Sequence, residues 1–214
     1  FDGHGSAIAQ VYNHLIMPLA NRKDKETQVI WGLYDFQRRF GRNAEGIWLA
    51  ESAVDTETLE ICADHGIQFT ILAPSQAKRF RKIGTKEWTD GINSNYHYRC
   101  KLPSGKLITL FFYDGERSQG VAFKGLLDDG KRFAEDLLSA FQETDQPQLV
   151  HIATDGESYG HHHKNGDMAL AYCMRYIESN NLAKITNYAQ YMHLVKPEYE
   201  AEIHENSSWS CAHG

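Results

Sequence analysis

The sequence predicts an α/β fold in which short buried strands alternate with helices. Residues 46–50 and 67–73 are short apolar runs of the kind that form buried strands. Residues 27–40 and 55–64 show helical spacing, so helix and strand alternate along this part of the chain. Such alternation is typical of parallel β/α units. With 214 residues, the chain is long enough to form one domain with a full core.

The stretch 149–163 carries the densest set of polar residues next to an apolar run. Residues 149–153 predict another buried strand, flanked by Pro147 and Gly156. This strand would deliver Asp155 at its carboxyl end, where α/β proteins place their chemistry. Glu157 and three consecutive histidines, 161–163, follow at once. For this segment alone, an Asp-Gly turn with a solvated Glu is an equally good interpretation.

A second carboxylate, Glu51, ends the predicted strand 46–50 in the same way. Asp55 or Thr56 then caps the helix that follows, with acidic residues in its first turn. Glu51 could itself be a capping acid beyond a strand. However, two strands that each end in an acid supply the pair of carboxylates that cleavage of a glycosidic bond requires.

Composition excludes several classes of function. The net charge of −6 and the lack of a basic stripe argue against a nucleic-acid partner. The one basic cluster is interpreted as the solvated face of a helix: Lys78, Arg79, Arg81 and Lys82. No apolar run approaches the roughly 20 residues that a membrane span requires. No signal peptide is visible, although the chain opens on Phe1 rather than a methionine.

The four cysteines are widely spaced, at Cys62, Cys100, Cys173 and Cys211. We interpret them as buried thiols of a reducing compartment rather than as a disulfide framework or a zinc site. They therefore favour a cytoplasmic location. The sequence leaves the oligomeric state open.

Periodicity predicts the first elements of the chain. Apolar residues at positions 8, 11, 15, 16 and 19 predict a helix that breaks near Pro18, with His14 on the helix or at its end. Residues 21–26 form a charged linker or a helix start. An amphipathic helix over 27–40 follows and ends at Gly41. Its expected buried face consists of Val29, Ile30, Leu33, Phe36 and Phe40.

A β-hairpin-like insertion is predicted near residues 84–117, with strands over 96–102 and 106–113 joined by a tight turn. Asp114 ends the second of these strands in an acid and competes for a place in the site. Helices are predicted over 128–142, 168–177 and 188–194, with a short strand over 184–186. Residues 200–204 then alternate toward Trp209.

Four stretches, taken in order, resemble conserved regions of the family 57 glycoside hydrolases. They are residues 10–19, which end in His-Leu-Ile-Met-Pro-Leu; 46–51, Gly-Ile-Trp-Leu-Ala-Glu; 154–162, Thr-Asp-Gly-Glu-Ser-Tyr-Gly-His-His; and 205–209, Glu-Asn-Ser-Ser-Trp, with His213 and Gly214. A single motif is weak, but four in the family's order along nearly the whole chain are specific. Two departures stand out. The family's opening strand, with a His-Gln-Pro-type motif, is missing before Phe1, and the last motif stops at Gly214.

The resemblance implies that residues 1–214 form a single, partial catalytic domain. The implied fold is an incomplete seven-stranded (β/α) barrel, (β/α)7, related to polysaccharide deacetylases. The implied activity is a retaining glycoside hydrolase or transglycosylase of the α-amylase or 4-α-glucanotransferase type, acting on α-linked glucans without a cofactor. By motif match, Glu51 would be the nucleophile and Asp155 the acid/base.

The same match extends to residues around the two carboxylates. His14, Trp48, His162 and Trp209 would line the sugar site, where an indole face suits the C–H side of a pyranose. Glu157 and His161 would support Asp155 without touching the substrate. A core tryptophan and a packing histidine are the ordinary structural interpretations of Trp48 and His14.

Retaining chemistry sets requirements that the structure should meet. The two carboxyl groups should lie about 5–5.5 Å apart. Glu51 must be ionised, which requires hydrogen-bond donors or a cation nearby; His4, His14 and the histidines after Gly160 are the candidates. Asp155 must hold its proton through the first step, which partial burial and the charge of Glu51 would favour.

Two other functions stay open. His161, His162 and His163 could bind zinc or another divalent ion together with Asp155 and Glu157, as in a metal-dependent, deacetylase-like hydrolase. Three consecutive histidines cannot all face one ion, which counts against this function. A glucan-binding module or inactive paralogue would keep the groove without turnover, and the presence of both carboxylates counts against it.

Overall fold

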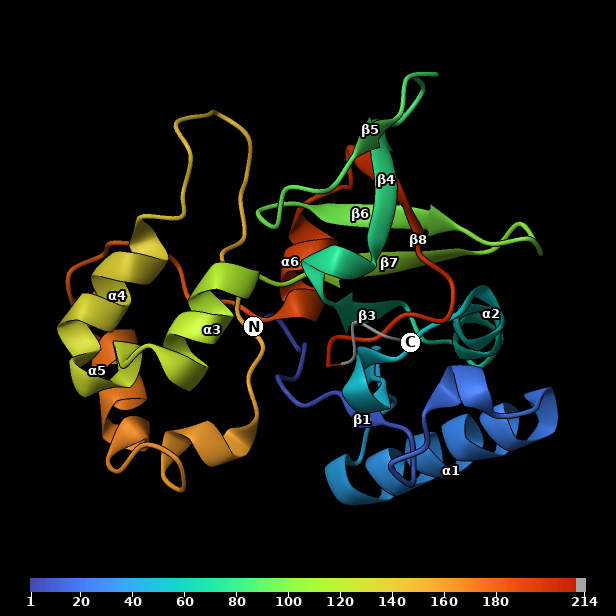
Figure 1. Ribbon diagram of the computed structural model, residues 1–214, viewed down its shortest axis with the longest axis horizontal. Helices are drawn as coiled ribbons and strands as arrows, with labels where there is room; N and C mark the ends of the chain where they lie inside the picture. Colours follow the sequence, from blue (N-terminus) through green and yellow to red (C-terminus); the bar gives the residue numbers. More distant parts are fainter. Residues whose placement is uncertain (211–214) are drawn as a thin grey trace.

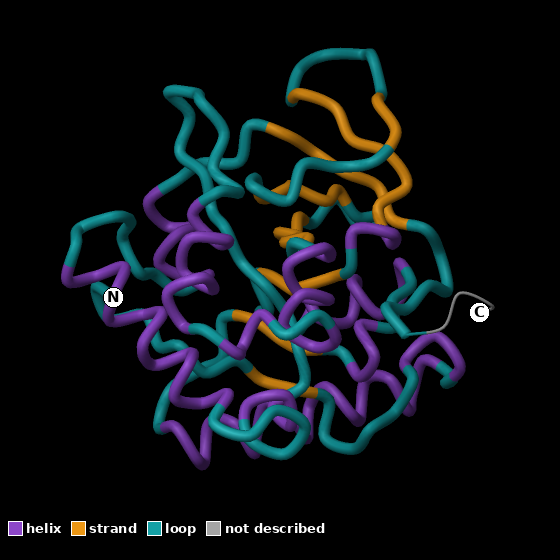
Figure 2. Tube along the Cα trace, turned by 60° about the vertical axis from the view of Figure 1, so that its left-hand side comes forward, coloured by secondary structure: helices purple, strands orange, loops and turns teal. Residues whose placement is uncertain are grey.

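The computed structural model describes residues 1–210. These residues form a mixed sheet in the order β1-β2-β3-β7-β6-β8-β4-β5, with helices packed around it (Figure 1). In Figure 2, the strands run through the middle and upper part of the trace, while helices cover its lower side. Residues 211–214, which include Cys211, His213 and Gly214 of the sequence predictions, lie outside the described residues.

One half of the sheet is parallel. The strands β1 (Ala9–Gln10), β2 (Gly46–Trp48), β3 (Phe69–Leu72) and β7 (Leu107–Phe112) pair side by side in the same direction. The helices α1 (Arg22–Phe40) and α2 (Thr56–Asp64) connect the first three strands as β/α units. The carboxyl ends of these strands therefore meet at one edge, as the sequence predicts.

The other half of the sheet is largely antiparallel. The strand β6 (His97–Lys101) forms a hairpin with β7, which confirms the predicted strand pair. The strand β8 (Tyr199–Ile203) runs parallel to β6 and antiparallel to β4 (Ala77–Lys82), and β5 (Thr89–Asp90) forms the edge. The α/β prediction is confirmed, and the sheet formed by residues 1–210 is open rather than closed into a barrel.

A group of helices stands beside the sheet (Figure 1). It consists of α3 (Gly115–Phe123), α4 (Gly130–Leu138) and α5 (Gly166–Ser179), which share an apolar cluster centred on Phe133 and Cys173. The last helix, α6 (Tyr188–Leu194), packs against the sheet through Ala189 and Tyr191. Within residues 1–210, no helix is both long enough and apolar enough to cross a membrane.

Helix boundaries follow the capping rules. Asn21 accepts a hydrogen bond from the Asp24 backbone N–H and begins α1, and Gly41 ends it with a φ of 67°. Residues 21–26 are therefore a helix start rather than a linker.

Gly32 lies where α1 meets β1, and a Cβ there would collide with the Gln10 carbonyl oxygen. Within the face that sequence predicts to be buried, Ile30 and Phe40 are exposed.

The predicted helix over residues 8–19 is wrong. Ala9 and Gln10 form β1, with Ala9 buried and Gln10 exposed, and a short 3₁₀ helix (Met17–Leu19) follows. The spacing of apolar residues predicts a helix here, but the backbone of Ala9 and Gln10 pairs with β2 instead. His14 consequently lies in the loop between these elements rather than on a helix.

The predicted strand over 149–153 is also wrong, because these residues belong to no strand of the sheet. Its backbone bonds instead with scattered groups: the His151 carbonyl accepts from the Asp114 N–H at 2.9 Å, and the Ala153 N–H donates to Ser118 Oγ at 3.1 Å. Residues 184–186 likewise form no strand. An apolar run indicates that its side chains are buried, and here residues of helices and loops cover them.

The basic cluster at residues 78–82 lies on the strand β4, so the helical interpretation is wrong. The strand β8 supplies acids opposite it: Arg79 bonds with Glu202 at 2.7 Å, and Arg81 with Glu200 at 2.6 Å. The cluster is thus neutralised within the sheet. Cys62, Cys100 and Cys173 are buried free thiols, as predicted.

Candidate active site

Glu51 lies in a turn directly after the carboxyl end of β2. The turn is a distorted 3₁₀ helix, Ala50–Ser52, in which Glu51 has φ 55° and Ser52 has φ 50°. Left-handed backbone costs a non-glycine residue about 1–3 kcal/mol and persists only where surrounding contacts enforce it. The strained turn directs the Glu51 carboxylate out of the sheet edge, where its side chain is 32% exposed.

The Glu51 carboxylate is held between two nitrogen groups that come from opposite ends of the chain. Trp209 Nε1 donates a hydrogen bond to Glu51 Oε2 at 3.0 Å, and His14 Nε2 lies 3.2 Å from Oε1. The hydrogen bonds from Ser210 and Trp209 hold the pKa of the Glu51 carboxyl below its usual range, outweighing partial burial. Glu51 is therefore an anion at neutral pH.

Aromatic rings fix the position of Trp209. Trp48 meets the Trp209 ring edge-on with centroids 5.0 Å apart, and Tyr113 does the same from 6.1 Å. The backbone N–H of Trp209 also donates to the Glu51 backbone carbonyl at 3.0 Å. Because the ring is packed on two sides, its N–H has one direction in which to donate, toward Glu51.

Asp155 ends the extended segment 149–155 and begins the short 3₁₀ helix Gly156–Tyr159. Its side chain is exposed, and its carboxylate has no hydrogen bond or ion pair with any residue between 1 and 210. The neighbouring Thr154 hydroxyl contacts the Tyr159 hydroxyl at 2.9 Å, while Ala153 is anchored on Ser118 of α3. The segment is thus fixed, whereas the Asp155 carboxylate is exposed, so the partial burial expected from the sequence is not found.

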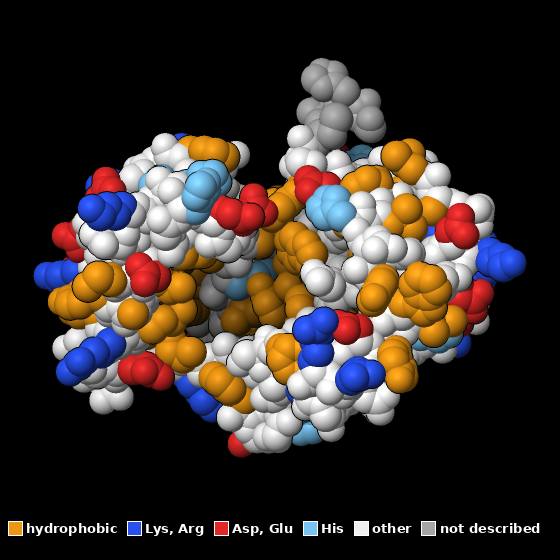
Figure 3. Space-filling model, turned by 90° about the horizontal axis from the view of Figure 1, so that it is seen from below, with side chains coloured by type: hydrophobic (Ala, Val, Ile, Leu, Met, Phe, Trp, Pro, Cys, Tyr) orange, Lys and Arg blue, Asp and Glu red, His pale blue; other side chains and the backbone are white. Residues whose placement is uncertain are grey.

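One cleft of about 640 Å³ brings the two predicted carboxylates together. Glu51 and Trp209 line one wall, and Asp155 with residues of α3 lines the other. Figure 3 shows a hollow between the two halves of the molecule, with acidic and histidine side chains on both sides and apolar side chains deeper inside. The cleft has room for a sugar ring between the walls.

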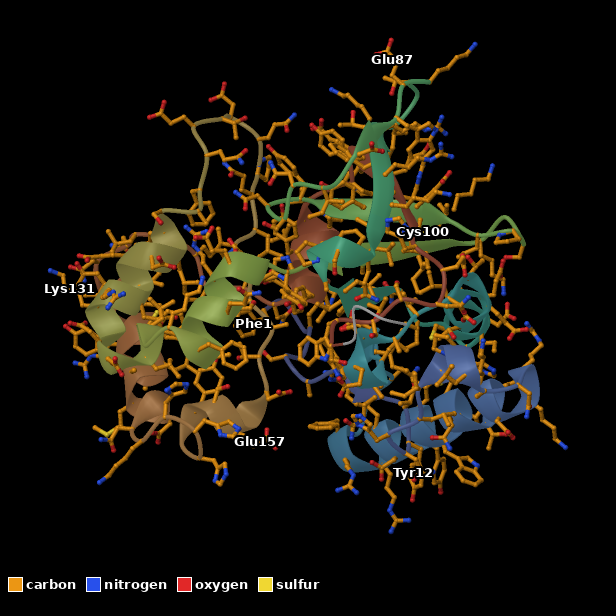
Figure 4. The ribbon with its side chains drawn as sticks, in the orientation of Figure 1. Phe1, Tyr12, Glu87, Cys100, Lys131 and Glu157 are labelled. Atoms are coloured by element: carbon orange, nitrogen blue, oxygen red, sulfur yellow. The ribbon has the colours of Figure 1, made fainter. Side chains whose placement is uncertain are left out.

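Of the residues predicted to line the sugar site, His14, Trp48 and His162 are not among those that line this cleft. Glu157 and His161, predicted to support Asp155, are not among them either. His161 and His162 are exposed and contact each other, with ring centroids 4.9 Å apart. Glu157 is exposed as well and faces the space between the two halves (Figure 4). His163 instead bonds with the Ala122 carbonyl at 2.9 Å. Among residues 1–210, no three His, Cys, Asp or Glu side chains are grouped so that they could hold a metal ion.

Two further candidates are placed elsewhere. His4, considered as a donor to Glu51, bonds with Glu45 at 2.6 Å, before the start of β2. Asp114, the competing strand-end acid, caps α3 through the Arg117 N–H and pairs with the Arg117 guanidinium at 2.8 Å. Neither residue is therefore available to the cleft.

Sequence reasoning missed part of the cleft lining: Tyr113, Gln119, Phe123 and Ser210. Tyr113 could have been found, since it follows the apolar strand 107–112 as Glu51 follows 46–48. Gln119 and Phe123 lie on a helix whose partners periodicity does not reveal. Phe123 is 83% exposed, so its ring is open to the cleft.

The family model of glycosyl hydrolase family 57 matches residues 2–204. The chain therefore belongs to this family, as the order of its motifs indicates. A search among curated proteins finds no match.

Solved structures support the same fold. A GH57-type branching enzyme from Pyrococcus horikoshii superposes with a TM-score of 0.75 at 18% identity, over 98% of this chain and 49% of that one. The α-amylase AmyC from Thermotoga maritima gives 0.74 at 12% identity, over 96% and 52%. A 4-α-glucanotransferase from Thermococcus litoralis gives 0.71 at 17% identity, over 94% and 30%. The chain thus spans between about a third and a half of each of these structures.

Proposed function

We propose that the intact protein is a retaining glycoside hydrolase or transglycosylase that acts on α-linked glucans. One observation carries this proposal: Glu51 and Asp155, the two strand-end acids of the family motifs, line opposite walls of one cleft. Their environments differ, since donors hold the Glu51 carboxylate whereas the exposed Asp155 carboxylate has no partner among residues 1–210. Family membership and glucan-active structural neighbours support the same class of substrate.

In the first half-reaction, a Glu51 oxygen attacks the anomeric carbon and the bond to the leaving oxygen breaks. Asp155 gives its proton to the leaving oxygen, so the departing sugar leaves as a neutral alcohol. The Trp209 N–H stays on the second Glu51 oxygen, which keeps the attacking oxygen directed into the cleft. The product is a glycosyl ester on Glu51.

In the second half-reaction, Asp155 has become a base. It accepts a proton from water or from a sugar hydroxyl, which then attacks the anomeric carbon and releases Glu51. Hydrolysis and transfer differ only in the acceptor. Trp209 and the exposed Phe123 ring line the cleft and offer apolar faces for pyranose rings, and Trp48 packs against Trp209.

The first test is to incubate the intact protein with a slow fluorinated α-glucosyl donor and to locate the adduct by peptide mass spectrometry. We expect one glucosyl group on Glu51. Asp155→Asn should lower kcat by about 10²–10⁴-fold with natural substrate, because it removes the general acid. Glu87→Gln is the control, since Glu87 lies at the tip beyond β4, far from the cleft (Figure 4).

Azide distinguishes the two roles. In Glu51→Ala, azide should replace the nucleophile and give the β-glucosyl azide, with inversion. In Asp155→Ala, azide should attack the intermediate and give the α-glucosyl azide, with retention. An adduct on another residue, or the same azide anomer from both variants, would refute the assignment.

A further inference from the structure

Gln76 is a completely buried amide at the end of the 3₁₀ helix Pro74–Gln76, directly behind the candidate active site. It is not among the residues that line the cleft, although Ala73, Pro74 and Ser75 are. A buried primary amide needs partners for one acceptor and two donor positions. The partners of Gln76 therefore show what it holds together.

The three partners lie on three separate segments. Gln76 Oε1 accepts a hydrogen bond from the Ala73 N–H at 2.9 Å, at the carboxyl end of β3. Gln76 Nε2 donates to the Ser52 carbonyl at 2.8 Å and lies 3.3 Å from Ser207 Oγ. One side chain thus joins the β3 terminus, the Glu51 turn and the segment that carries Trp209.

The bond to Ser52 acts on the strained part of the turn. Glu51 and Ser52 are both left-handed, and such backbone persists only where contacts enforce it. The N–H side of the peptide after Ser52 bonds within the turn, from Ala53 to the Ala50 carbonyl at 2.9 Å, so its carbonyl side is left for an external contact. Gln76 provides that contact at the Ser52 carbonyl. The direction of the Glu51 side chain depends on the same backbone torsions.

The contact with Ser207 acts on the donor to Glu51. Ser207 lies two residues before Trp209 and pairs with Val54 through two backbone hydrogen bonds of 2.9 and 3.2 Å. The Gln76 backbone carbonyl also accepts from the His204 N–H at 2.8 Å, which fixes the start of this segment. Gln76 therefore sets the spacing between the carboxylate and its indole donor from behind both.

We propose that Gln76 is a positioning residue for the nucleophile, one that holds Glu51 and Trp209 in register without touching substrate. This role rests on the proposed function. Its loss should slow attack by Glu51, because a displacement of about 1 Å can cost about 10²-fold in rate, while sugar binding through the cleft surface remains. Glucan affinity should change little.

The test compares Gln76→Met with Gln190→Met in the intact protein. Gln190 is a matched control, because it is also a buried amide (3% exposed) with side-chain partners, Asp2 and Thr186, away from the cleft. We expect Gln76→Met to lower the rate of adduct formation from the fluorinated donor about 10–100-fold, with the Kd for maltooligosaccharide within about twofold of wild type. Gln190→Met should lose thermal stability but keep the wild-type rate.

A second variant, Gln76→Glu, gives a pH signature. When protonated, its carboxyl O–H can donate to the Ser52 carbonyl; when ionised, it places a charge against that oxygen. The rate of adduct formation should approach that of wild type at low pH and should fall as the pH rises, because the new carboxyl then ionises. This decrease would add a limb to the pH profile that wild type does not have. If Gln76→Met does not fold, the pH profile of Gln76→Glu tests the positioning role of Gln76.

Two failures can be told apart. If wild-type protein forms no adduct on Glu51, the proposed function is wrong and the role of Gln76 falls with it. If wild type reacts and Gln76→Met reacts as fast as Gln190→Met, only the role of Gln76 is overturned. A Gln76→Glu variant without the added pH limb would lead to the same conclusion.

Discussion

At the scale of single residues, the candidate site depends on donors that keep Glu51 ionised. The carboxylate combines a strained backbone, an indole N–H at 3.0 Å and an imidazole nitrogen at 3.2 Å. The bonds from Ser210 and Trp209 lower the pKa of Glu51, so an ionised carboxylate is present across the neutral range. Asp155 has no such donors among residues 1–210, so the two carboxylates differ in their hydrogen bonding.

Trp209→Phe should shift the pH dependence of the reaction. Loss of the indole N–H removes a bond that favours the ionised carboxyl, so the pKa of Glu51 rises. As the pH is lowered, activity should therefore be lost at a higher pH than in wild type. At neutral pH, kcat/KM should fall about tenfold, the equivalent of one hydrogen bond of about 1.4 kcal/mol. The measurement is a pH profile of kcat/KM.

The control for this change is Trp31→Phe, because Trp31 is half exposed on the helix α1 and contacts Tyr12 instead of the cleft. Its profile should match that of wild type. An unchanged acid limb in Trp209→Phe would show that the indole does not govern the ionisation of Glu51.

At the scale of elements, the Glu51 turn is anchored by the helices on its two sides. Lys25 of α1 is only 2% exposed, and its Nζ lies 2.5 Å from Asp55 and 3.0 Å from Glu57. Asp55 in turn caps α2 through the Thr58 N–H. Burial acts to raise the pKa of Asp55, but bonds from Lys25 and Thr58 outweigh it and hold this pKa below the usual 3.8.

Lys25→Met should destabilise the protein by about 3–5 kcal/mol, because it leaves a buried carboxylate without its cation. Urea unfolding at pH 7 measures this loss. Since the folded-state pKa of Asp55 is depressed, its contribution is complete at neutral pH and is lost as the pH falls through and below about 4. The difference between wild type and Lys25→Met should therefore shrink in acid.

Lys131→Met provides the comparison, since Lys131 is exposed and pairs with Glu135 one helical turn away. It should unfold at nearly the same urea concentration as wild type. Equal unfolding of the two variants would mean that the Lys25 pair contributes no more than a surface pair.

At the scale of the whole molecule, the two carboxylates belong to different halves. Glu51 stands on the parallel sheet, whereas Asp155 is fastened to the separately packed helices α3, α4 and α5. The cleft lies between these halves, so its shape depends on how they are held together (Figure 3). A bound glucan that contacts both walls would add to that connection.

Hydrogen exchange of intact Glu51→Gln protein with maltoheptaose tests this arrangement, because under the proposed function this variant should bind sugar without turnover. Amides of both walls should gain protection, namely residues 50–54 on one side and 115–123 with 156–159 on the other. At a ligand concentration of 100 times Kd, global stability should rise by about 2.7 kcal/mol. The exposed turn at residues 83–87 serves as the internal control; protection of one wall alone would contradict a shared site.

The sequence was sufficient wherever the deciding contacts are local. Residues 46–50 form a short apolar run that Glu51 follows, so a strand with an acid just beyond its carboxyl end is visible without any partner. The helix α6 matches its predicted bounds, 188–194, because its periodicity is complete within seven residues. The Asp55 cap of α2 is likewise a contact across three residues.

Prediction failed where distant segments supply the hydrogen bonds. Residues 8–19 have helical spacing, yet pairing with β2 makes Ala9 and Gln10 a strand. Residues 149–153 are apolar, yet single groups from α3 and the loops replace a ladder. Periodicity records which side chains are buried, and it does not identify what buries them.

The sequence alone therefore determined the family, the α/β alternation and the two acids, because motifs and apolar runs are read from neighbouring residues. Only the tertiary structure decided that Trp209, 158 positions away, donates to Glu51, and that both acids face one cleft. It also decided the left-handed turn at Glu51, where the Ser52 carbonyl accepts a hydrogen bond from Gln76 of another segment. These features depend on contacts between residues far apart in the chain, and no local pattern encodes their geometry.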